Sequence, residues 1–142
     1  GTDDFERKLT LKGRQVVEAQ AQVLANKKII PDAIISSSAR RTRETAEIVA
    51  YEWGIPKVLG AEKWLYHDFT TNDFLNWLAK TDHNLQCLLV IGHNPTISNM
   101  AYRLSKQVDF SFSPATLALI SFHVDKWEQV EASSGDLLFY SL

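Results

Sequence analysis

The stretch Leu88-Leu89-Val90-Ile91-Gly92-His93-Asn94-Pro95-Thr96 decides how this chain is expected to fold. Four consecutive large apolar residues predict a strand that is buried on both faces, as strands inside parallel sheets are. The strand is expected to end at Gly92, with Asn94 as a helix N-cap and Pro95 as the first helical residue. His93 then lies at the carboxyl end of a strand, the edge where open α/β sheets bind ligands.

A second strand-to-helix junction of the same kind comes earlier in the chain. Asp32–Ile35 predicts another short buried strand, which Ser36-Ser37-Ser38 and a helix from about Ala39 follow. Three of the four residues at 40–43 are arginines, although the dipole of a helix disfavours cations in its first turn. Backbone N–H groups, hydroxyls and guanidinium groups at a helix N-terminus together suit a bound phosphate. The two junctions therefore predict one shared anion site.

The remaining periodicity predicts a layered α/β domain, because strands and helices alternate over Ala33–Ser105. The predicted helices are Thr10–Lys27 (inner face Val16, Val17, Ala21 and Leu24), Ala39–Trp53, Asn72–Lys80 and one that follows Pro95. The predicted strands are Ala33–Ile35, Lys57–Ala61, Leu88–Ile91, Leu117–Val124, Glu128–Ala132 and Leu137–Tyr140, with loops over Trp64–Thr71 and Val108–Ala115.

Length and composition predict one domain over residues 1–142, with an ordinary apolar fraction of 45%. A net charge of −2 argues against binding to nucleic acid or to an anionic membrane. The single cysteine, Cys87, cannot form an internal disulfide and is typical of a reducing, cytoplasmic compartment. No apolar run reaches the ~18–20 residues that span a membrane.

Four segments carry a resemblance to a known family. Phe5–Gly13 is similar to a segment in which Arg-Pro-Leu-Thr/Ser precedes a glycine, with Lys8 in place of the proline. Ser37–Ala46 is similar to Ser-Pro-x-x-Arg-Ala-x-Gln-Thr-Ala, and Leu65-Tyr66 and Val90–Pro95 are similar to two further motifs. In this order they resemble the histidine phosphatase superfamily, in particular its small phosphohistidine-phosphatase (SixA-like) branch.

The resemblance implies a three-layer α/β/α sandwich with a mostly parallel central sheet, the phosphoglycerate mutase-like or histidine phosphatase fold. The family's nucleophile lies in an N-terminal strand that ends Arg-His-Gly or Arg-His-Ala. None of the four histidines (His67, His83, His93 and His123) follows an arginine. The first strand is therefore expected upstream of Gly1, which makes the domain N-terminally incomplete. A chain that truly begins at Gly1 is expected to fold poorly and to have no turnover.

The resemblance also implies roles for individual residues. Arg41 falls on the family's phosphate-binding arginine, whose planar guanidinium suits bidentate contact with phosphoryl oxygens. His93 would donate a hydrogen bond to the same group and, as imidazolium, add charge. Arg7 would be a third cation, and Ser37 would bind the phosphate or cap the helix. The candidates for a proton donor are Glu62, His67 and Asp68, and the family needs no metal and no cofactor.

These features predict a metal-independent phosphatase that forms a phosphohistidine intermediate and acts on phosphohistidine or another phosphoprotein. Phosphohistidine fits because its labile P–N bond makes little demand on an acid, and because no long insertion encloses the site. One alternative is a small-molecule phosphomonoesterase of the same superfamily. Another is a non-catalytic phosphate- or phosphoprotein-binding pseudo-enzyme that keeps Arg41 and His93.

Overall fold

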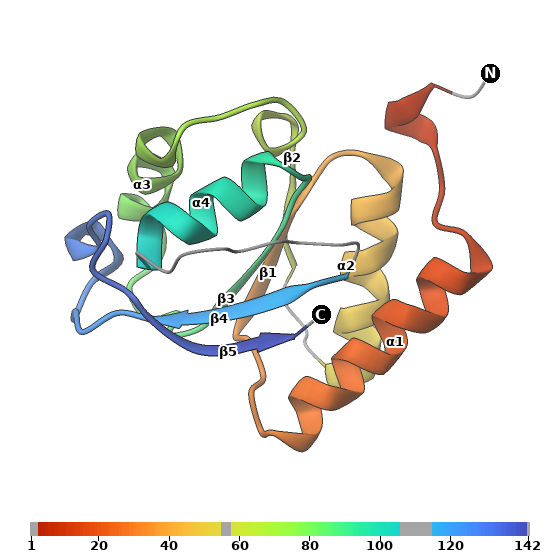
Figure 1. Cartoon of the computed structure of the whole chain (residues 1–142), viewed down its shortest axis with the longest axis horizontal. Helices are drawn as coiled ribbons and strands as arrows, with labels where there is room; N and C mark the ends of the chain where they lie inside the picture. The colour runs from red at the N-terminus through yellow and green to blue at the C-terminus, as the bar shows by residue number, and fades with distance from the viewer. Residues whose placement is uncertain (1–2, 55–57, 106–114, 142) are drawn as a thin grey trace. The chain divides into compact units, whose positions relative to one another are not determined.

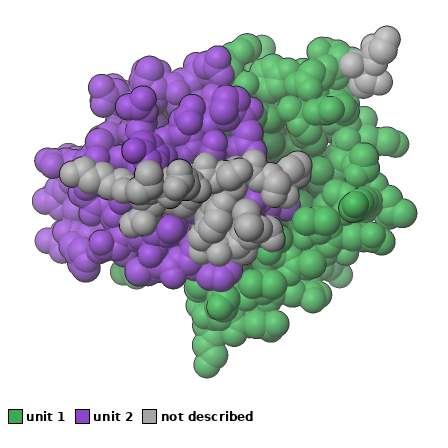
Figure 2. All heavy atoms as spheres, in the orientation of Figure 1, with its two compact units in different colours: residues 1–67, 86–93 green, residues 68–85, 94–142 purple. Residues whose placement is uncertain are grey.

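The computed structural model describes residues 3–54, 58–105 and 115–141. Their contacts divide the chain into two compact units, which Figure 2 distinguishes by colour. Unit 1 comprises residues 1–67 and 86–93, and unit 2 comprises residues 68–85 and 94–142. One domain over residues 1–142 stays a prediction.

The sheet of unit 1 is parallel. β1 (Ala33–Ser37) lies between β2 (Val58–Glu62) and β3 (Leu88–Ile91), and it runs parallel to both (Figure 1). All five residues of β1 are buried, as expected for an apolar strand with a ladder partner on each edge. The predicted α/β fold with a parallel central sheet is therefore confirmed.

β3 is less buried than its sequence predicts. All four of its residues are partly exposed, so the expectation that this strand is covered on both faces is wrong for the structure. Within the described ranges β3 has a ladder partner on one side alone, which is β1. A strand at the edge of a sheet keeps one row of backbone groups unpaired and gives its side chains fewer neighbours.

Two helices follow the expected boundaries in unit 1. α1 (Leu11–Asn26) begins where the Thr10 hydroxyl accepts a hydrogen bond from the Gly13 N–H, and it buries Val17, Ala21 and Leu24. Val16 is 38% exposed, so its placement on the inner face is wrong, because it lies about 100° around the helix from Val17. α2 (Arg40–Trp53) ends at Gly54, which has the left-handed φ of 64° typical of this position.

The start of α2 is tied to the segment that leads into α1. The Leu9 N–H donates to Glu44 Oε1 at 2.8 Å, and Arg14 Nη2 lies 3.3 Å from Glu44 Oε2. At the other end of α2, the Trp53 indole N–H donates to the carbonyl of Ala21 in α1 at 2.6 Å. These contacts fix the first turn of α2, which carries Arg41, against the chain around residue 9.

Unit 2 contains two helices and a two-stranded antiparallel sheet. α3 (Thr71–Ala79) begins with a capping box between Thr70 and Asp73. α4 (Thr96–Ser105) begins one residue later than predicted, at Thr96 and not at Pro95. β4 (Leu117–Ser121) pairs with β5 (Asp136–Ser141), so the strand predicted over Leu117–Val124 ends earlier than expected.

The strand predicted over Glu128–Ala132 is wrong. Trp127–Gln129 instead forms the 3₁₀ turn η3, because Gln129 Oε1 accepts hydrogen bonds from the backbone N–H groups of Asp125 and Lys126, both at 3.0 Å. The loop predicted over Trp64–Thr71 contains the end of a second such turn, η2 (Lys63–Leu65). Lys57 and most of the loop predicted over Val108–Ala115 lie outside the described residues.

The turn before β5 closes the end of α4. The Ser133 and Gly135 N–H groups donate to the carbonyls of Arg103 and Leu104 at 2.8 and 2.9 Å. A Cβ at Gly135 would lie 2.7 Å from Phe122 Cε1 and would also strike the Ile120 side chain. The close approach of the turn to β4 therefore requires a glycine at this position.

We expect Gly135→Ala to lower the free energy of unfolding by about 1–3 kcal/mol, the usual cost of forcing an extra methyl group into a packed site. Urea denaturation, monitored by circular dichroism, measures this loss of unfolding free energy. The matched control is Ser134→Ala, which removes an exposed hydroxyl bonded to the Glu131 carbonyl and should cost less than about 1 kcal/mol. Equal stability of the two variants would show that the turn has room for a side chain.

Candidate functional site

The two predicted strand-to-helix junctions meet in unit 1. β1 and β3 are neighbouring parallel strands, so Ser37 at the end of β1 and His93 just after β3 emerge at the same edge of the sheet. His93 Nε2 lies 2.7 Å from Ser37 Oγ. Arg41, in the first turn of α2, places Nη2 3.1 Å from His93 Nδ1. The structure therefore brings Ser37, Arg41 and His93 together.

The partners of His93 define its tautomer. A guanidinium group has donors and no acceptor, so the Arg41 N–H donates to an unprotonated His93 Nδ1. The ring proton is then on Nε2 and is donated to Ser37 Oγ. Ser37 Oγ also accepts the Ala39 N–H at 3.1 Å, which directs this hydroxyl toward the start of α2. In this arrangement His93 is a neutral imidazole.

The surroundings of His93 favour the same neutral form. Burial lowers the pKa of His93 below its ordinary 6.5, and the nearby Arg41 guanidinium lowers it further, whereas Asp4 opposes this shift. The expectation that His93, as imidazolium, adds charge toward a bound phosphate stays a prediction, because the neutral form is that of the protein without an anion. An incoming anion would supply the negative charge that the imidazolium form needs.

Asp4 is the site residue that the sequence did not indicate. It lies in the short 3₁₀ turn η1 (Asp4–Glu6), and its backbone carbonyl accepts a hydrogen bond from Arg41 Nη1 at 2.8 Å. Asp4 Oδ2 lies 3.3 Å from Arg41 Nη2 and accepts the Tyr66 hydroxyl at 2.8 Å. Asp4 Oδ1 lies 3.2 Å from Arg7 Nη2, so one carboxylate touches both predicted phosphate-binding arginines.

These partners keep the Asp4 carboxyl group ionised. The hydrogen bond from Tyr66 and the positive charges of Arg41 and Arg7 hold its pKa below the ordinary 3.8, although desolvation opposes them. The same hydrogen bond raises the pKa of Tyr66 above 10.0, because the carboxylate favours the protonated phenol. At neutral pH the pair is thus a carboxylate and a phenol.

Tyr66 is the centre of an aromatic cluster beside this site. Its ring meets His93 edge-on with centroids 5.4 Å apart, and it meets Phe5 in the same way at 5.0 Å. The adjacent His67 lies 5.3 Å from Tyr66. The Leu65-Tyr66 pair therefore contributes a buried leucine and a tyrosine that contacts His93 and Asp4.

The three predicted proton donors lie in different surroundings. Glu62, at the end of β2, pairs with Ser37 in the strand register, while His67 is exposed beside Tyr66. Asp68 belongs to unit 2, where it accepts a hydrogen bond from the Thr96 hydroxyl at 2.9 Å. Among the described residues of unit 1, neither Glu62 nor His67 forms a hydrogen bond or ion pair with Arg41, and the role of all three candidates as acids stays a prediction.

The neighbouring arginines on α2 are engaged elsewhere. Arg40 Nε lies 3.8 Å from Glu44 Oε2, and Arg43 Nε donates to the Ser38 carbonyl at 3.0 Å. Among the described residues, the Ser38 hydroxyl is the buried side-chain polar group that lacks a hydrogen-bond partner. Of the three arginines at the start of α2, Arg41 is thus the one directed at His93.

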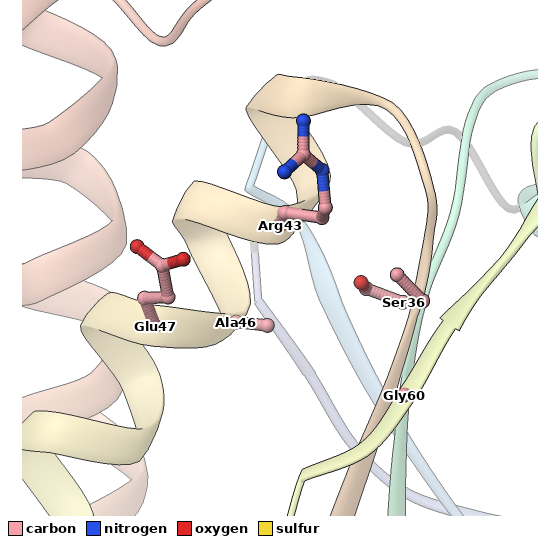
Figure 3. A pocket seen from close by; sticks show the side chains of 6 residues that line it. Ser36, Arg43, Ala46, Glu47 and Gly60 are labelled. Atoms are coloured by element: carbon pink, nitrogen blue, oxygen red, sulfur yellow. The ribbon is translucent and has the colours of Figure 1, made fainter.

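A separate cavity of about 180 Å³ lies between α2 and the strands β1 and β2 (Figure 3). Its lining is Ser36, Arg43, Ala46, Glu47, Gly60 and Ala61. The small side chains at four of these positions leave the space open. Ser37, Arg41 and His93 do not line it, so the cavity is distinct from the candidate site.

The described part of the chain lacks two further features. Over residues 3–54, 58–105 and 115–141, no three His, Cys, Asp or Glu side chains group closely enough to hold a metal ion. Within the same ranges, every helix is too short or too polar to cross a membrane.

The fold of the chain is that of solved phosphohistidine phosphatase structures. A protein from Nakamurella multipartitia, described as phosphohistidine phosphatase SixA, matches with a TM-score of 0.84 and 23% identity, over 100% of this chain and 88% of that one. A protein from Agrobacterium tumefaciens with the same description matches with a TM-score of 0.81 and 21% identity, over 100% of this chain and 87% of that one. The protein histidine phosphatase SixA in complex with tungstate matches with a TM-score of 0.83 and 20% identity, over 99% of this chain and 86% of that one.

The sequence comparison is consistent with this fold. Residues 1–62 match the pattern of the histidine phosphatase superfamily (branch 1), and this segment contains Arg7, Ser37 and Arg41. No curated protein sequence matches the chain. The predicted resemblance to the histidine phosphatase superfamily and to SixA-like structures is thus confirmed.

We expect NMR titration of the anion-free protein to give His93 a pKa below 6.5. Arg41→Gln should raise the pKa of His93, because it removes the positive charge that helps to lower it. Arg40→Gln should leave this pKa unchanged, since Arg40 pairs with Glu44. The folded pKa lies below the unfolded one, so stability from this residue is complete at higher pH and falls as the pH drops through about 6.5. An unchanged His93 pKa in Arg41→Gln would contradict the contact.

Proposed function

We propose that the protein is a metal-independent phosphatase that acts through a phosphohistidine intermediate on phosphohistidine or another phosphoprotein. The observation that carries the proposal is the cluster of Arg41, His93 and Ser37 at the carboxyl ends of two adjacent parallel strands. This edge is where ligands bind in open α/β sheets. The family pattern over residues 1–62 and the SixA-like fold support the same reaction class.

In the proposed reaction, a histidine nitrogen attacks phosphorus in line while the bond from phosphorus to the leaving group breaks. The leaving group departs with the electron pair of that bond and takes a proton. Water then attacks the phosphohistidine, which releases phosphate and restores the histidine. Phosphoryl transfer depends mostly on positioning and on stabilising the charge of the equatorial oxygens, which here falls to Arg41 and His93.

The attacking histidine is proposed to precede Gly1 in the natural reading frame. His93 is already committed to Arg41 and Ser37, and the other histidines of the chain do not follow an arginine. The partly exposed apolar residues of β3 support this proposal. A further parallel strand on the free edge of β3 would bury them and pair its backbone groups, and it would end beside His93.

The state of Asp4 bears on the substrate. Its lowered pKa makes this carboxylate a poor proton donor at neutral pH, although it is the acidic side chain in contact with Arg41. An alkoxide leaving group needs a proton from an acid, whereas the nitrogen of phosphohistidine is already a good leaving group once protonated. An ionised Asp4 thus supports a phosphoramidate substrate, whereas an alkyl phosphate would depend on Glu62, His67 or Asp68 as the acid.

We expect the protein expressed from its uncut natural reading frame to form an acid-labile phosphoenzyme when it is mixed with phosphohistidine substrate. Arg41→Gln should reduce its rate of formation by about 10²-fold or more, as loss of a donor to the transition state does elsewhere. Arg40→Gln, with the same change of charge one residue away, should change it less than about threefold. Rapid-quench labelling and N-terminal sequencing provide the measurement.

The outcomes of that labelling separate the rival functions. Labelling with an alkyl phosphate that is faster than with phosphohistidine would point to a small-molecule phosphomonoesterase. A natural protein that begins near Gly1, binds phosphate and never becomes labelled would point to a binding module.

We expect sulfate, a dianion throughout pH 5–8, to raise the pKa of His93 when it binds. The ligand supplies negative charge that favours imidazolium, so by linkage its affinity should increase as the pH falls toward the pKa of the free protein. The measurement is His93 NMR titration with and without saturating sulfate. A His93 pKa that sulfate leaves unchanged would place the anion elsewhere.

A further inference from the structure

We propose that Asp4 is a positioning residue, whose carboxylate orients Arg41 and Arg7 toward the phosphoryl group and is itself held by the Tyr66 hydroxyl. The inference rests on the proposed function for the identity of the ligand. Its geometric part, the fixing of the Arg41 side chain, is independent of the reaction.

The contacts of Asp4 leave Arg41 little freedom. Arg41 Nη1 donates to the Asp4 carbonyl, and Nη2 lies between Asp4 Oδ2 and His93 Nδ1. Two guanidinium nitrogens with partners on two separate segments fix both the position and the rotation of this planar group. The opposite carboxylate oxygen, Oδ1, contacts Arg7. Asp4 therefore connects the two arginines that the sequence assigns to the phosphate.

Tyr66 determines where the Asp4 carboxylate can lie. Its hydroxyl donates to Oδ2, the same oxygen that faces Arg41, and its ring is packed between Phe5 and His93. Tyr66 follows directly on Leu65, which is 1% exposed and anchors η2 in the core of unit 1. The chain of contacts thus runs from a buried leucine through Tyr66 and Asp4 to Arg41.

This network orients the Arg41 side chain and contributes little to the stability of the fold. The Asp4 side chain is 54% exposed, and exposed ion pairs contribute little to the free energy of folding. A carboxylate near an anion site should also repel the anion. Asp4 would therefore weaken binding if it acted through charge alone, and strengthens it if it acts by orienting Arg41. The sign of its effect on anion affinity distinguishes the two roles.

The test compares Asp4→Asn with Glu6→Gln in the protein expressed from its natural reading frame, using sulfate as the probe and calorimetry as the measurement. Both substitutions remove one negative charge from the same short turn, but among the described residues Glu6 forms no ion pair with either arginine. We expect Asp4→Asn to weaken sulfate binding about five- to tenfold, as loss of a hydrogen bond between charged groups does. Glu6→Gln should leave the affinity unchanged or slightly higher.

A second readout follows the Arg41 guanidinium directly. Nitrogen-15 NMR of the anion-free protein reports rotation about its Cζ–Nε bond, which we expect to be slow in the wild type and in Glu6→Gln and faster in Asp4→Asn. Tyr66→Phe, which keeps the ring contacts and loses the hydroxyl, should raise the pKa of Asp4 and weaken sulfate binding about twofold.

The two proposals fail in different ways. If Asp4→Asn binds sulfate as tightly as Glu6→Gln or more tightly, or if the rotation of Arg41 is unchanged, Asp4 is not a positioning residue. If the wild type binds no sulfate, the anion site of the proposed function is wrong, and the rotation of Arg41 alone decides whether Asp4 orients it.

Discussion

The site depends on one hydrogen bond, which runs from His93 Nε2 to Ser37 Oγ at 2.7 Å. It joins the segments that leave two neighbouring parallel strands, so its length is set by the strand register and not by a flexible loop. Because Ser37 Oγ also accepts the Ala39 N–H, the bond further ties His93 to the start of α2. Arg41 is the second residue of that helix, and its contact with His93 Nδ1 follows from this placement.

The charges of the site are only partly balanced before any anion arrives, and the site keeps a net positive charge. Arg41 and Arg7 carry two positive charges, Asp4 carries one negative charge, and His93 is neutral because burial and Arg41 lower its pKa. Two arginines brought together without a carboxylate would repel each other and would be free to turn toward solvent. Asp4 keeps the guanidinium groups of Arg41 and Arg7 close together. Protonation of His93 is then the step that a bound anion promotes.

The sequence reveals those parts of the site whose position follows from local pattern. His93 and Arg41 each lie beside a short apolar strand, and parallel strands bring their carboxyl ends together, so a shared site at the two junctions could be predicted without coordinates. The family resemblance, and not the local pattern, distinguishes Arg41 from Arg40 and Arg43. Asp4 could not be predicted in this way, because its role depends on Tyr66, which lies 62 residues away along the chain and contacts Asp4 only once the chain is folded. Similarly, four apolar residues in β3 report a preference for burial, but not how many neighbours the strand has. The 3₁₀ turn at Trp127–Gln129 overlaps the strand predicted over Glu128–Ala132, because the Gln129 side chain determines the local backbone by accepting hydrogen bonds from the Asp125 and Lys126 N–H groups.

The edge of β3 that has no ladder partner among the described residues and the candidate site support the same proposal. A strand of large apolar side chains that stays partly exposed is costly in water and invites pairing with another strand. The carboxyl end of any parallel strand added there would emerge beside His93, at the edge where Arg41 also lies. A histidine at the end of such a strand would face the guanidinium and the imidazole together. On this geometry, one added strand would both extend the sheet and bring the proposed nucleophile to the candidate site.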